Sequence, residues 1–310
     1  MMRALVTGGA GFIGHHLVRA LVERGDEVVV LDDFSTGLRS RLVPLEGHIE
    51  LVEGDIRDAV AVDRAIAGCS VVFHEGALPS VARSVRDARL SNDVNTTGTI
   101  EVMLAAKRAR VDRVVFAGSS SVYGDSPELP RRETQRPNPL SPYAVSKLAG
   151  EAYVHTLGSL NGIETVVLRY FNVFGPGQDP NSEYAAVVPK FITAALAGER
   201  PTVHGDGTYS RDFIHIDNVV SANLLAASVP GVSGLTCNIG CGARYSLLEL
   251  LDAIGDTLGH KLNPVFTEPR PGDVPHSLAD ISLASEMLGY RVLILFSEGV
   301  RRTVAAFRVS

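Results

Sequence analysis

Two features of the sequence predict an α/β fold with a doubly wound parallel sheet and a smaller C-terminal α/β lobe. Short apolar runs alternate with helical patterns through the first half of the chain, which is typical of a parallel sheet covered by helices on both faces. After about Gly175 this alternation gives way to loops rich in Gly, Pro and Asp, short strands and a few helices. We therefore expect one domain over residues 1–175, to which some later segments return, and a lobe over residues 176–310.

The apolar and helical patterns place the elements. Strands are expected over residues 3–7, 28–31, 49–52, 71–74, 113–117 and 165–169. Helices are expected over residues 13–23 and 88–109, from Pro142 onwards, and in the lobe near residues 186–197, 217–227 and 247–258. Because ligands bind at the carboxyl ends of the strands in such sheets, small and polar residues that directly follow a strand are the candidate site.

Composition and charge exclude several classes of protein. The 310 residues are 45% hydrophobic and carry a formal net charge of −6, and no basic run stands out, so we expect no nucleic-acid or membrane partner. The three cysteines, Cys69, Cys237 and Cys241, suit a reducing compartment, and their spacing does not predict a metal site. No apolar stretch is long enough to span a bilayer, and no signal peptide is apparent. We expect a soluble, cytoplasmic protein.

A glycine-rich turn follows the first strand and predicts a dinucleotide site of the Rossmann type. Gly8 allows the tight turn, Gly11 lets the backbone approach a pyrophosphate, and Gly14 lets the next helix pack closely on the strand. Asp32 ends the second strand, where a carboxylate binds the adenosine ribose hydroxyls. Because a carboxylate repels a 2′-phosphate, the pattern favours NAD over NADP. Asp55, after the third strand, is expected to accept from the adenine amino group or to cap the following helix.

The chemistry is expected from Tyr143 and Lys147, which a helix places one turn apart on the same face. An ammonium beside a phenol favours the phenolate, so we expect Lys147 to lower the pKa of Tyr143 and to make it a proton acceptor near neutral pH. Three hydroxyl groups, those of Ser119, Ser120 and Ser121, follow the fifth strand directly. Their position at the carboxyl edge of the sheet marks them as candidate catalytic groups.

These motifs together resemble the extended short-chain dehydrogenase/reductase family, and within it the nucleotide-sugar 4-epimerases. The resemblance is carried by TGGAGFIG at residues 7–14, SSSVYG at 119–124, YAVSK at 143–147, RYFNVFG at 169–175, QDPN at 178–181, RDFIHID at 211–217 and RPGD at 270–273. The stretches at 169–175 and 178–181 look most like the branch that acts on UDP-N-acetylglucosamine and UDP-N-acetylgalactosamine. The resemblance implies an NAD-dependent UDP-sugar 4-epimerase, with a 4-keto sugar as intermediate and UDP-glucose/UDP-galactose as a further possible pair.

The resemblance also implies roles for single residues. Tyr143, Lys147, Ser119, Ser120 and Ser121 would be catalytic. Cofactor binding would involve Gly8, Gly11, Phe12, Ile13, Gly14, Asp32, Asp33, Phe34, Ser35, Gly37, Asp55, Ile56, Gly76, Ala77, Asn95, Tyr143, Lys147 and Tyr170. Substrate binding would involve Asn172, Val187, Val188, Arg211, Arg270, Asp273 and Ser277. No metal is expected.

The sequence departs from the family at Glu75-Gly76-Ala77, where two alanines usually follow one other residue. Glu75 adds a carboxylate beside the cofactor, and either orientation, into the site or away from it, is open. Arg169 and Arg211 are among the arginines considered for the diphosphate of the substrate, although a single arginine is usually a solvated surface charge.

The same residues favour or disfavour several other functions. A nucleotide-sugar dehydratase or decarboxylase needs acidic residues near Ser120 and Ser121, and hydroxyls are poor acids and bases at neutral pH. A UDP-glucuronate 4-epimerase stays open, since Arg83 or Ser84 would suit the sugar carboxylate. Ser277 stands where glucose-restricted relatives carry tyrosine, which favours N-acetylated sugars. An NADP-linked reductase is disfavoured by Asp32. A non-catalytic NAD-binding regulator is disfavoured because the Tyr–Lys pair is present.

The resemblance implies a homodimer in which the helices over residues 88–109 and around Tyr143 pair with their copies. Val102, Leu148 and Ala152 are candidates for that interface, although periodicity alone does not separate an interface from the core.

Overall fold

A seven-stranded sheet forms the centre of the computed structural model, which describes residues 1–180, 186–269 and 274–308. The strand order is β11-β6-β5-β4-β1-β2-β3, and every neighbouring pair is parallel. The strands are β1 (Arg3–Thr7), β2 (Glu27–Asp32), β3 (Ile49–Glu53), β4 (Val71–His74), β5 (Arg113–Ser119), β6 (Glu164–Tyr170) and β11 (Leu235–Ile239). The doubly wound parallel sheet is thus confirmed, and the six predicted strands lie within two residues of their expected ends.

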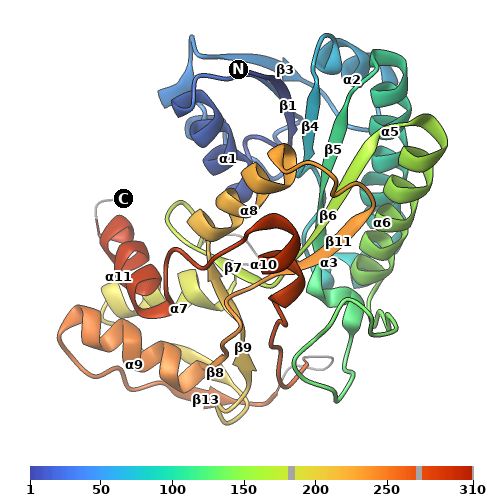
Figure 1. Ribbon diagram of the computed structural model, residues 1–310. Helices are drawn as coiled ribbons and strands as arrows, with labels where there is room; N and C mark the ends of the chain where they lie inside the picture. The colour runs from blue at the N-terminus through green and yellow to red at the C-terminus, as the bar shows by residue number, and fades with distance from the viewer. Residues whose placement is uncertain (181–185, 270–273, 309–310) are drawn as a thin grey trace.

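Helices cover both faces of this sheet (Figure 1). On one face pack α1 (Phe12–Glu23), α8 (Ile216–Ser228) and α10 (Ser282–Leu288). On the other pack α2 (Ala59–Ile66), α5 (Gly98–Ala109) and α6 (Pro142–Asn161). Successive strand residues serve opposite cores: Leu5 belongs to the second, whereas Ala4 and Val6 belong to the first. This is why the central strands read as continuous apolar runs.

The predicted helix over residues 88–109 is one continuous helical segment with an irregular turn. It consists of α4 (Ala88–Asn92), the π-helical turn η3 (Asp93–Thr97) and α5. The other short helices are η1 (Arg39–Arg41), η2 (Val43–Leu45), α3 (Val81–Arg86) and η4 (Ser120–Tyr123). Val102 of α5, an expected interface residue, is fully buried in the core. Leu148 packs partly against the cluster around Tyr123. Of the three interface candidates, only Ala152 is exposed among the described residues.

In the residues that the structure describes, the lobe contains three two-stranded sheets and three helices, at the lower left of Figure 1. Its strands are β7 (Asn172–Phe174) with β10 (Phe213–His215), β8 (Thr202–His204) with β13 (Val265–Thr267), and β9 (Ser210–Arg211) with β12 (Tyr245–Ser246). Its helices are α7 (Val187–Leu196), α9 (Leu247–Leu258) and α11 (Phe296–Phe307). These elements enclose a core of their own, with Phe174, Phe191, Leu250 and Val300 buried in it.

Several segments that follow residue 175 return to the central layer. The unpredicted strand β11 extends the sheet beyond β6, α8 packs beside α1, and α10 packs against β11 and α8. The division of the chain into a domain over residues 1–175, with later segments returning to it, and a lobe over residues 176–310 stays a prediction. Within the described residues, no helix combines the length and the apolar character needed to cross a membrane.

Candidate active site

A cavity of about 640 Å³ opens at the carboxyl ends of the central strands. The sheet order reverses beside β1, whose neighbours are β2 and β4, and ligands bind at such a switch point. Most of the predicted cofactor residues line the cavity: Gly8, Gly11, Phe12, Ile13, Gly14, Asp32, Asp33, Phe34, Ser35, Gly37, Ile56, Gly76, Ala77, Tyr143, Lys147 and Tyr170. The sequence motifs that lie far apart in the chain therefore meet around one space.

The glycine turn between β1 and α1 has no room for side chains. Gly8 has φ +68°, and a Cβ there would lie 2.7 Å from the Cα of Gly76. A Cβ at Gly14 would lie 2.1 Å from the carbonyl oxygen of Gly8. Helix α1 begins directly after Gly11, and no side chain of the described residues caps it. Its first N–H groups and its positive dipole end thus face the cavity, as an anion site requires.

Asp32 is held rigidly at the end of β2. Its two carboxylate oxygens accept from the backbone N–H groups of Ala10 and Phe34, both at 2.8 Å. Burial raises the pKa of Asp32, and the two backbone hydrogen bonds oppose that rise. The carboxylate therefore joins the glycine turn to the segment after β2, on the wall of the cavity.

Two predicted cofactor residues do not line the cavity. The Asp55 carboxylate is paired with the Arg57 guanidinium and accepts from the Arg57 N–H at 2.8 Å. The alternative that Asp55 caps the next helix is wrong, because Asp58 caps α2 by accepting from Val60 N. Asn95 is buried, accepts from the N–H of Leu78 at 2.7 Å and donates to the Ser146 hydroxyl at 3.0 Å. In the structure Asn95 braces the cavity wall against α6.

Helix α6 places Tyr143 and Lys147 on the cavity wall, one turn apart. Ser141 caps the helix by accepting from Ala144 N at 3.2 Å, with Pro142 in the first turn. The Tyr143 N–H donates to the Ser84 hydroxyl at 3.0 Å. Lys147 is buried, and its Nζ donates to the carbonyl of Ala117 at 2.9 Å. The Lys147 side chain is thereby fixed relative to the end of β5.

The three serines lie where β5 ends and η4 begins. The hydroxyls of Ser119 and Ser121 are hydrogen-bonded to each other at 2.8 Å, and Ser119 also hydrogen-bonds the side chain of Tyr143. Ser120 is half-buried beside them. Ser119 thus connects the hydrogen-bonded hydroxyls of Ser119 and Ser121 to Tyr143.

The sequence predicted that Lys147 lowers the pKa of Tyr143. This prediction is wrong as far as the protein's own residues are concerned. Burial raises the pKa of Tyr143, the hydrogen bond with Ser119 opposes this, and the Glu75 carboxylate raises the pKa further. Burial also lowers the pKa of Lys147, which the Glu75 charge partly offsets. The expectation neglected desolvation and the carboxylate, both of which favour the neutral phenol.

Arg169 makes structural contacts and does not line the cavity. It is therefore not placed to bind a diphosphate there. It is 4% exposed and forms an ion pair with Glu151 of α6. Its Nη1 also donates to the Tyr123 hydroxyl at 2.8 Å, and that hydroxyl donates to Asn238 of β11 at 2.7 Å. The network joins α6, β6, β11 and the end of η4 behind the site.

The predicted substrate residues that the structure describes lie in the lobe, outside the cavity wall. The Ser277 hydroxyl donates to Asn172 Oδ1 at 3.3 Å, and Arg211 Nη1 donates to the carbonyls of Ser210 and Pro275 at 3.0 Å. Val188 is 1% exposed in the lobe core, and Val187 packs against that core. Arg270 and Asp273 lie outside the described residues. The roles of all seven stay predictions.

Sequence reasoning missed Arg41, which lines the cavity from η1. Its guanidinium donates to the carbonyl of Ala10 at 3.0 Å and to that of Gly177 at 2.7 Å. Gln178 and Asp179 line the same wall from the segment after β7. No local motif marks such a residue, because its two acceptors lie 31 and 136 residues away.

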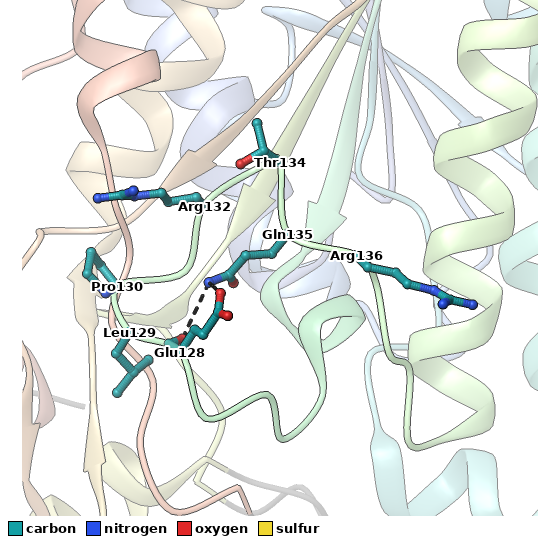
Figure 2. Close-up of a pocket in the computed structure, with 7 residues that line it drawn as sticks. All are labelled: Glu128, Leu129, Pro130, Arg132, Thr134, Gln135 and Arg136. Atoms are coloured by element: carbon teal, nitrogen blue, oxygen red, sulfur yellow. Dashed lines mark hydrogen bonds between the residues drawn. The ribbon is translucent and has the colours of Figure 1, made fainter.

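A second cavity, of about 580 Å³, lies along the loop between η4 and α6 (Figure 2). Gln135 donates to the Glu128 carboxylate there at 3.3 Å, while Arg132 and Arg136 extend away in opposite directions. Arg132 pairs with Asp280 at 3.0 Å. The lining residues include none of the predicted site residues, and its charges do not converge on a common point.

The family model described as "NAD dependent epimerase/dehydratase family" matches residues 4–240. The chain belongs to this family, as the fold and the site indicated. The cofactor is NAD, and the residues fit it: the glycine turn leaves room for a backbone approach, α1 offers its N-terminus, and Asp32 lies on the cavity wall at the end of β2.

The chain is similar over nearly its whole length to several characterised proteins. It is 40% identical over 311 residues to a UDP-glucose 4-epimerase of Mycolicibacterium smegmatis, covering 99% of each chain. It superposes with a TM-score of 0.94 and 37% identity on a UDP-N-acetylglucosamine 4-epimerase of Methanobrevibacter ruminantium M1 in complex with UDP-N-acetylmuramic acid, covering 99% of this chain and 98% of the other. A UDP-glucuronic acid 4-epimerase of Bacillus cereus, in complex with UDP-glucuronic acid and NAD, superposes with a TM-score of 0.92 and 30% identity, covering 99% of each.

Proposed function

We propose that the protein is an NAD-dependent UDP-sugar 4-epimerase. The observation that carries the proposal is that Tyr143 and Lys147 line the same cavity as the glycine turn and Asp32. A proton-transfer group and a dinucleotide site therefore share one space. We further propose that UDP-N-acetylglucosamine and UDP-N-acetylgalactosamine are the preferred pair, and that UDP-glucose and UDP-galactose are also accepted.

The cofactor half of the site would be formed by residues 1–175. Gly8, Gly11 and Gly14 with the start of α1 would hold the pyrophosphate, and Asp32 the adenosine ribose. Lys147, whose Nζ is fixed on the Ala117 carbonyl, would bond the nicotinamide ribose. When bound, NAD supplies the acceptor for the C4 hydride and, in its oxidised form, a positive charge beside the phenol.

Tyr143 would move the proton in both directions. As phenolate it takes the proton of the sugar 4-hydroxyl while the C4 hydride leaves the sugar, which yields a 4-keto sugar. After the keto sugar turns over, Tyr143 returns the proton to the 4-oxygen as hydride comes back on the opposite face. Ser119, hydrogen-bonded to Tyr143 and to Ser121, would hold the 4-oxygen and relay the proton. Ser120 would assist at the same edge.

The lobe, residues 176–310, together with Asn172 of β7, would hold the UDP group while the sugar turns. The residues proposed for this are Asn172, Val187, Val188, Arg211, Arg270 and Asp273. Because Val188 is buried in the lobe core, its contribution would come from its backbone. The small side chain of Ser277, hydrogen-bonded to Asn172, would leave room for an N-acetyl group and offer it a hydroxyl.

A UDP-glucuronate 4-epimerase is the second candidate, because Arg83 lines the cavity and would suit a sugar carboxylate. Ser84 is less suited, since its hydroxyl already donates to the Val81 carbonyl at 2.7 Å and accepts from Tyr143 N. A dehydratase or decarboxylase is disfavoured because Ser120 and Ser121 offer hydroxyls where those reactions need acids.

The test is to incubate the purified protein with UDP-N-acetylglucosamine, UDP-glucose and UDP-glucuronate in parallel, with and without added NAD, and to follow the anomeric protons by NMR. We expect the N-acetylated sugar to convert to its 4-epimer fastest. Tyr143→Phe should slow conversion by roughly 10²–10⁴-fold, the usual contribution of a general acid–base group. Tyr153→Phe, a tyrosine 42% exposed on the same helix, should leave the rate unchanged.

The outcomes separate the parts of this proposal. If only UDP-glucuronate converts, the epimerase stands and the preference for N-acetylated sugars fails. If no UDP-sugar converts with NAD supplied, the epimerase itself fails. We also expect a cytoplasmic homodimer, which sedimentation of the purified protein and fractionation of cells would test.

A further inference from the structure

Glu75 occupies the loop after β4 and lines the cavity together with Gly76 and Ala77. Its Oε1 accepts from the Tyr170 hydroxyl at 2.7 Å. That hydroxyl is also hydrogen-bonded to the side chain of Asn223 on α8, with distances of 2.8 and 3.1 Å to the amide nitrogen and oxygen. The carboxylate therefore points into the site, held by the Tyr170 hydroxyl of β6, which Asn223 of α8 in turn contacts. This settles the orientation that the sequence left open.

The titratable groups around Glu75 come from each element packed against it. Lys147 and Tyr143 face it from α6, and Tyr170 faces it from β6, whereas Asn223 of α8 is neutral. His74 precedes it on β4, hydrogen-bonded to Thr7 and Thr99, and burial lowers its pKa to about 3, so its ring is neutral. The negative charge of Glu75 is thus opposed by the positive charge of Lys147.

We propose that Glu75 is a positioning residue of the reaction site: its carboxylate holds Tyr170 at the cofactor wall and supplies the negative charge that balances Lys147 beside Tyr143. The inference rests on the proposed function, in which Tyr143 must both take and return a proton. An oxidised nicotinamide would favour the phenolate that takes the proton, and Lys147 would keep a positive charge on this wall after the nicotinamide has been reduced. A carboxylate at the same wall restores proton affinity to the phenol and keeps both directions accessible.

The electrostatics support this assignment. The carboxylate raises the pKa of Tyr143 and that of Lys147. Burial raises the pKa of Glu75 to about 7, although the Tyr170 hydrogen bond and the Lys147 charge oppose the rise, so Glu75 carries its charge in the more alkaline range in which Tyr143 ionises. Removing the charge at Glu75 should therefore move the ionisation of Tyr143 to lower pH.

The test uses the NAD-loaded protein with tyrosines labelled with ¹³C at Cζ, and Tyr143→Phe to assign the Tyr143 resonance. Glu75→Gln keeps the volume and an acceptor for Tyr170 but removes the charge. We expect its Tyr143 titration midpoint to fall by about one pH unit, the scale of a nearby charge. The acid limb of the pH–rate profile should move in the same direction. Tyr170→Phe is the matched control, because it removes the hydrogen bond and keeps the charge; its Tyr143 midpoint should stay near that of the wild type.

Glu75→Leu is a second charge-free variant in case Glu75→Gln does not fold, since replacing a buried charge by an apolar group is often tolerated. An unchanged Tyr143 midpoint in a folded charge-free variant overturns the inference. So does a shift in Tyr170→Phe as large as that in Glu75→Gln. A shifted midpoint in a protein that converts no UDP-sugar leaves the electrostatic role standing and removes the proposed function.

Discussion

Arg41 shows how one side chain joins the cofactor wall to the rest of the chain. Its guanidinium reaches the carbonyl of Ala10, within the glycine turn, and that of Gly177, after β7. Burial lowers its pKa, and the charges of Asp179 and Asp32 oppose that change. A half-buried arginine that bonds two backbone carbonyls fixes both segments in one geometry.

Replacing Arg41 should loosen the hold on NAD. We expect Arg41→Ala to release bound NAD at least about tenfold faster, a loss of roughly 1.4 kcal/mol, because the glycine turn and the segment after β7 lose their common anchor. The measurement is the loss of NAD from the purified protein into a cofactor-free buffer. Arg108→Ala, which removes a surface pair between Arg108 of α5 and Asp63 of α2, is the control. Equal release from both variants contradicts the role given to Arg41.

At the scale of elements, the β1–glycine turn–α1 unit depends on backbone approach rather than on side chains. Gly8 and Gly25 both have positive φ, +68° and +85°, so an alanine is strained at either position. They differ in space: a Cβ at Gly8 meets the backbone of Gly76, and a Cβ at Gly25 meets nothing within 4 Å.

Gly8→Ala and Gly25→Ala therefore form a matched pair. In each variant the free energy of unfolding should fall by about 1–2 kcal/mol, because alanine is strained in the left-handed conformation. Chemical denaturation measures this loss. Gly8→Ala should lose more than this and should no longer retain NAD, because the loop carrying Gly76 must move away from the turn. The steric argument fails if Gly8→Ala binds NAD as tightly as Gly25→Ala does.

At the scale of the whole molecule, a buried network ties the sheet to α6. Arg169 and Glu151 form an ion pair, and Arg169 bonds Tyr123, which in turn bonds Asn238 of β11. Removing one partner of such a pair leaves an uncompensated buried charge.

We expect Glu151→Ala to lower the free energy of unfolding by about 3–5 kcal/mol, as found for broken buried pairs. Glu50→Ala removes a partner of the exposed Arg3 pair and should cost far less. Urea denaturation of the NAD-free proteins measures both. Similar costs for the two variants would mean that the Arg169 network adds little to the stability of the fold.

The contact between α1 and the segment after β7 should make stability depend on pH. His16 Nε2 is hydrogen-bonded to the Pro176 carbonyl at 2.8 Å, and burial lowers the pKa of His16 to about 4 and that of His15 to about 3. In the unfolded chain a histidine titrates near 6.5. Between pH 6.5 and 4 the unfolded state thus binds protons that the native state does not, and stability falls as the pH falls.

His16→Gln should remove one proton from this linkage, so its free energy of unfolding should vary with pH less steeply than that of the wild type, by up to about 1.4 kcal/mol per pH unit. Asp212, whose pKa burial raises to about 6, contributes a slope of opposite sign. Variants are therefore compared with the wild type by denaturation at several pH values. His48→Gln, an exposed histidine, is the control; equal slopes in all three proteins contradict the prediction.

The sequence by itself determined the features that depend on local patterns. Apolar runs located six of the seven strands of the sheet, and five of these, β1, β2, β4, β5 and β6, are buried over almost their whole length. The glycine turn and the Tyr143–Lys147 spacing were readable because steric limits and helix period act over a few residues.

Only the tertiary structure decided which distant groups meet and how strongly they ionise. β11 lies apart from β6 in the chain, Arg41 reaches a carbonyl 136 residues away, and Glu75 meets Tyr170 95 residues away. The direction of the Tyr143 pKa likewise came from burial and from Glu75, not from the helical spacing. Contacts between elements are set by how whole faces pack, and desolvation depends on that packing, so neither is visible in a local pattern.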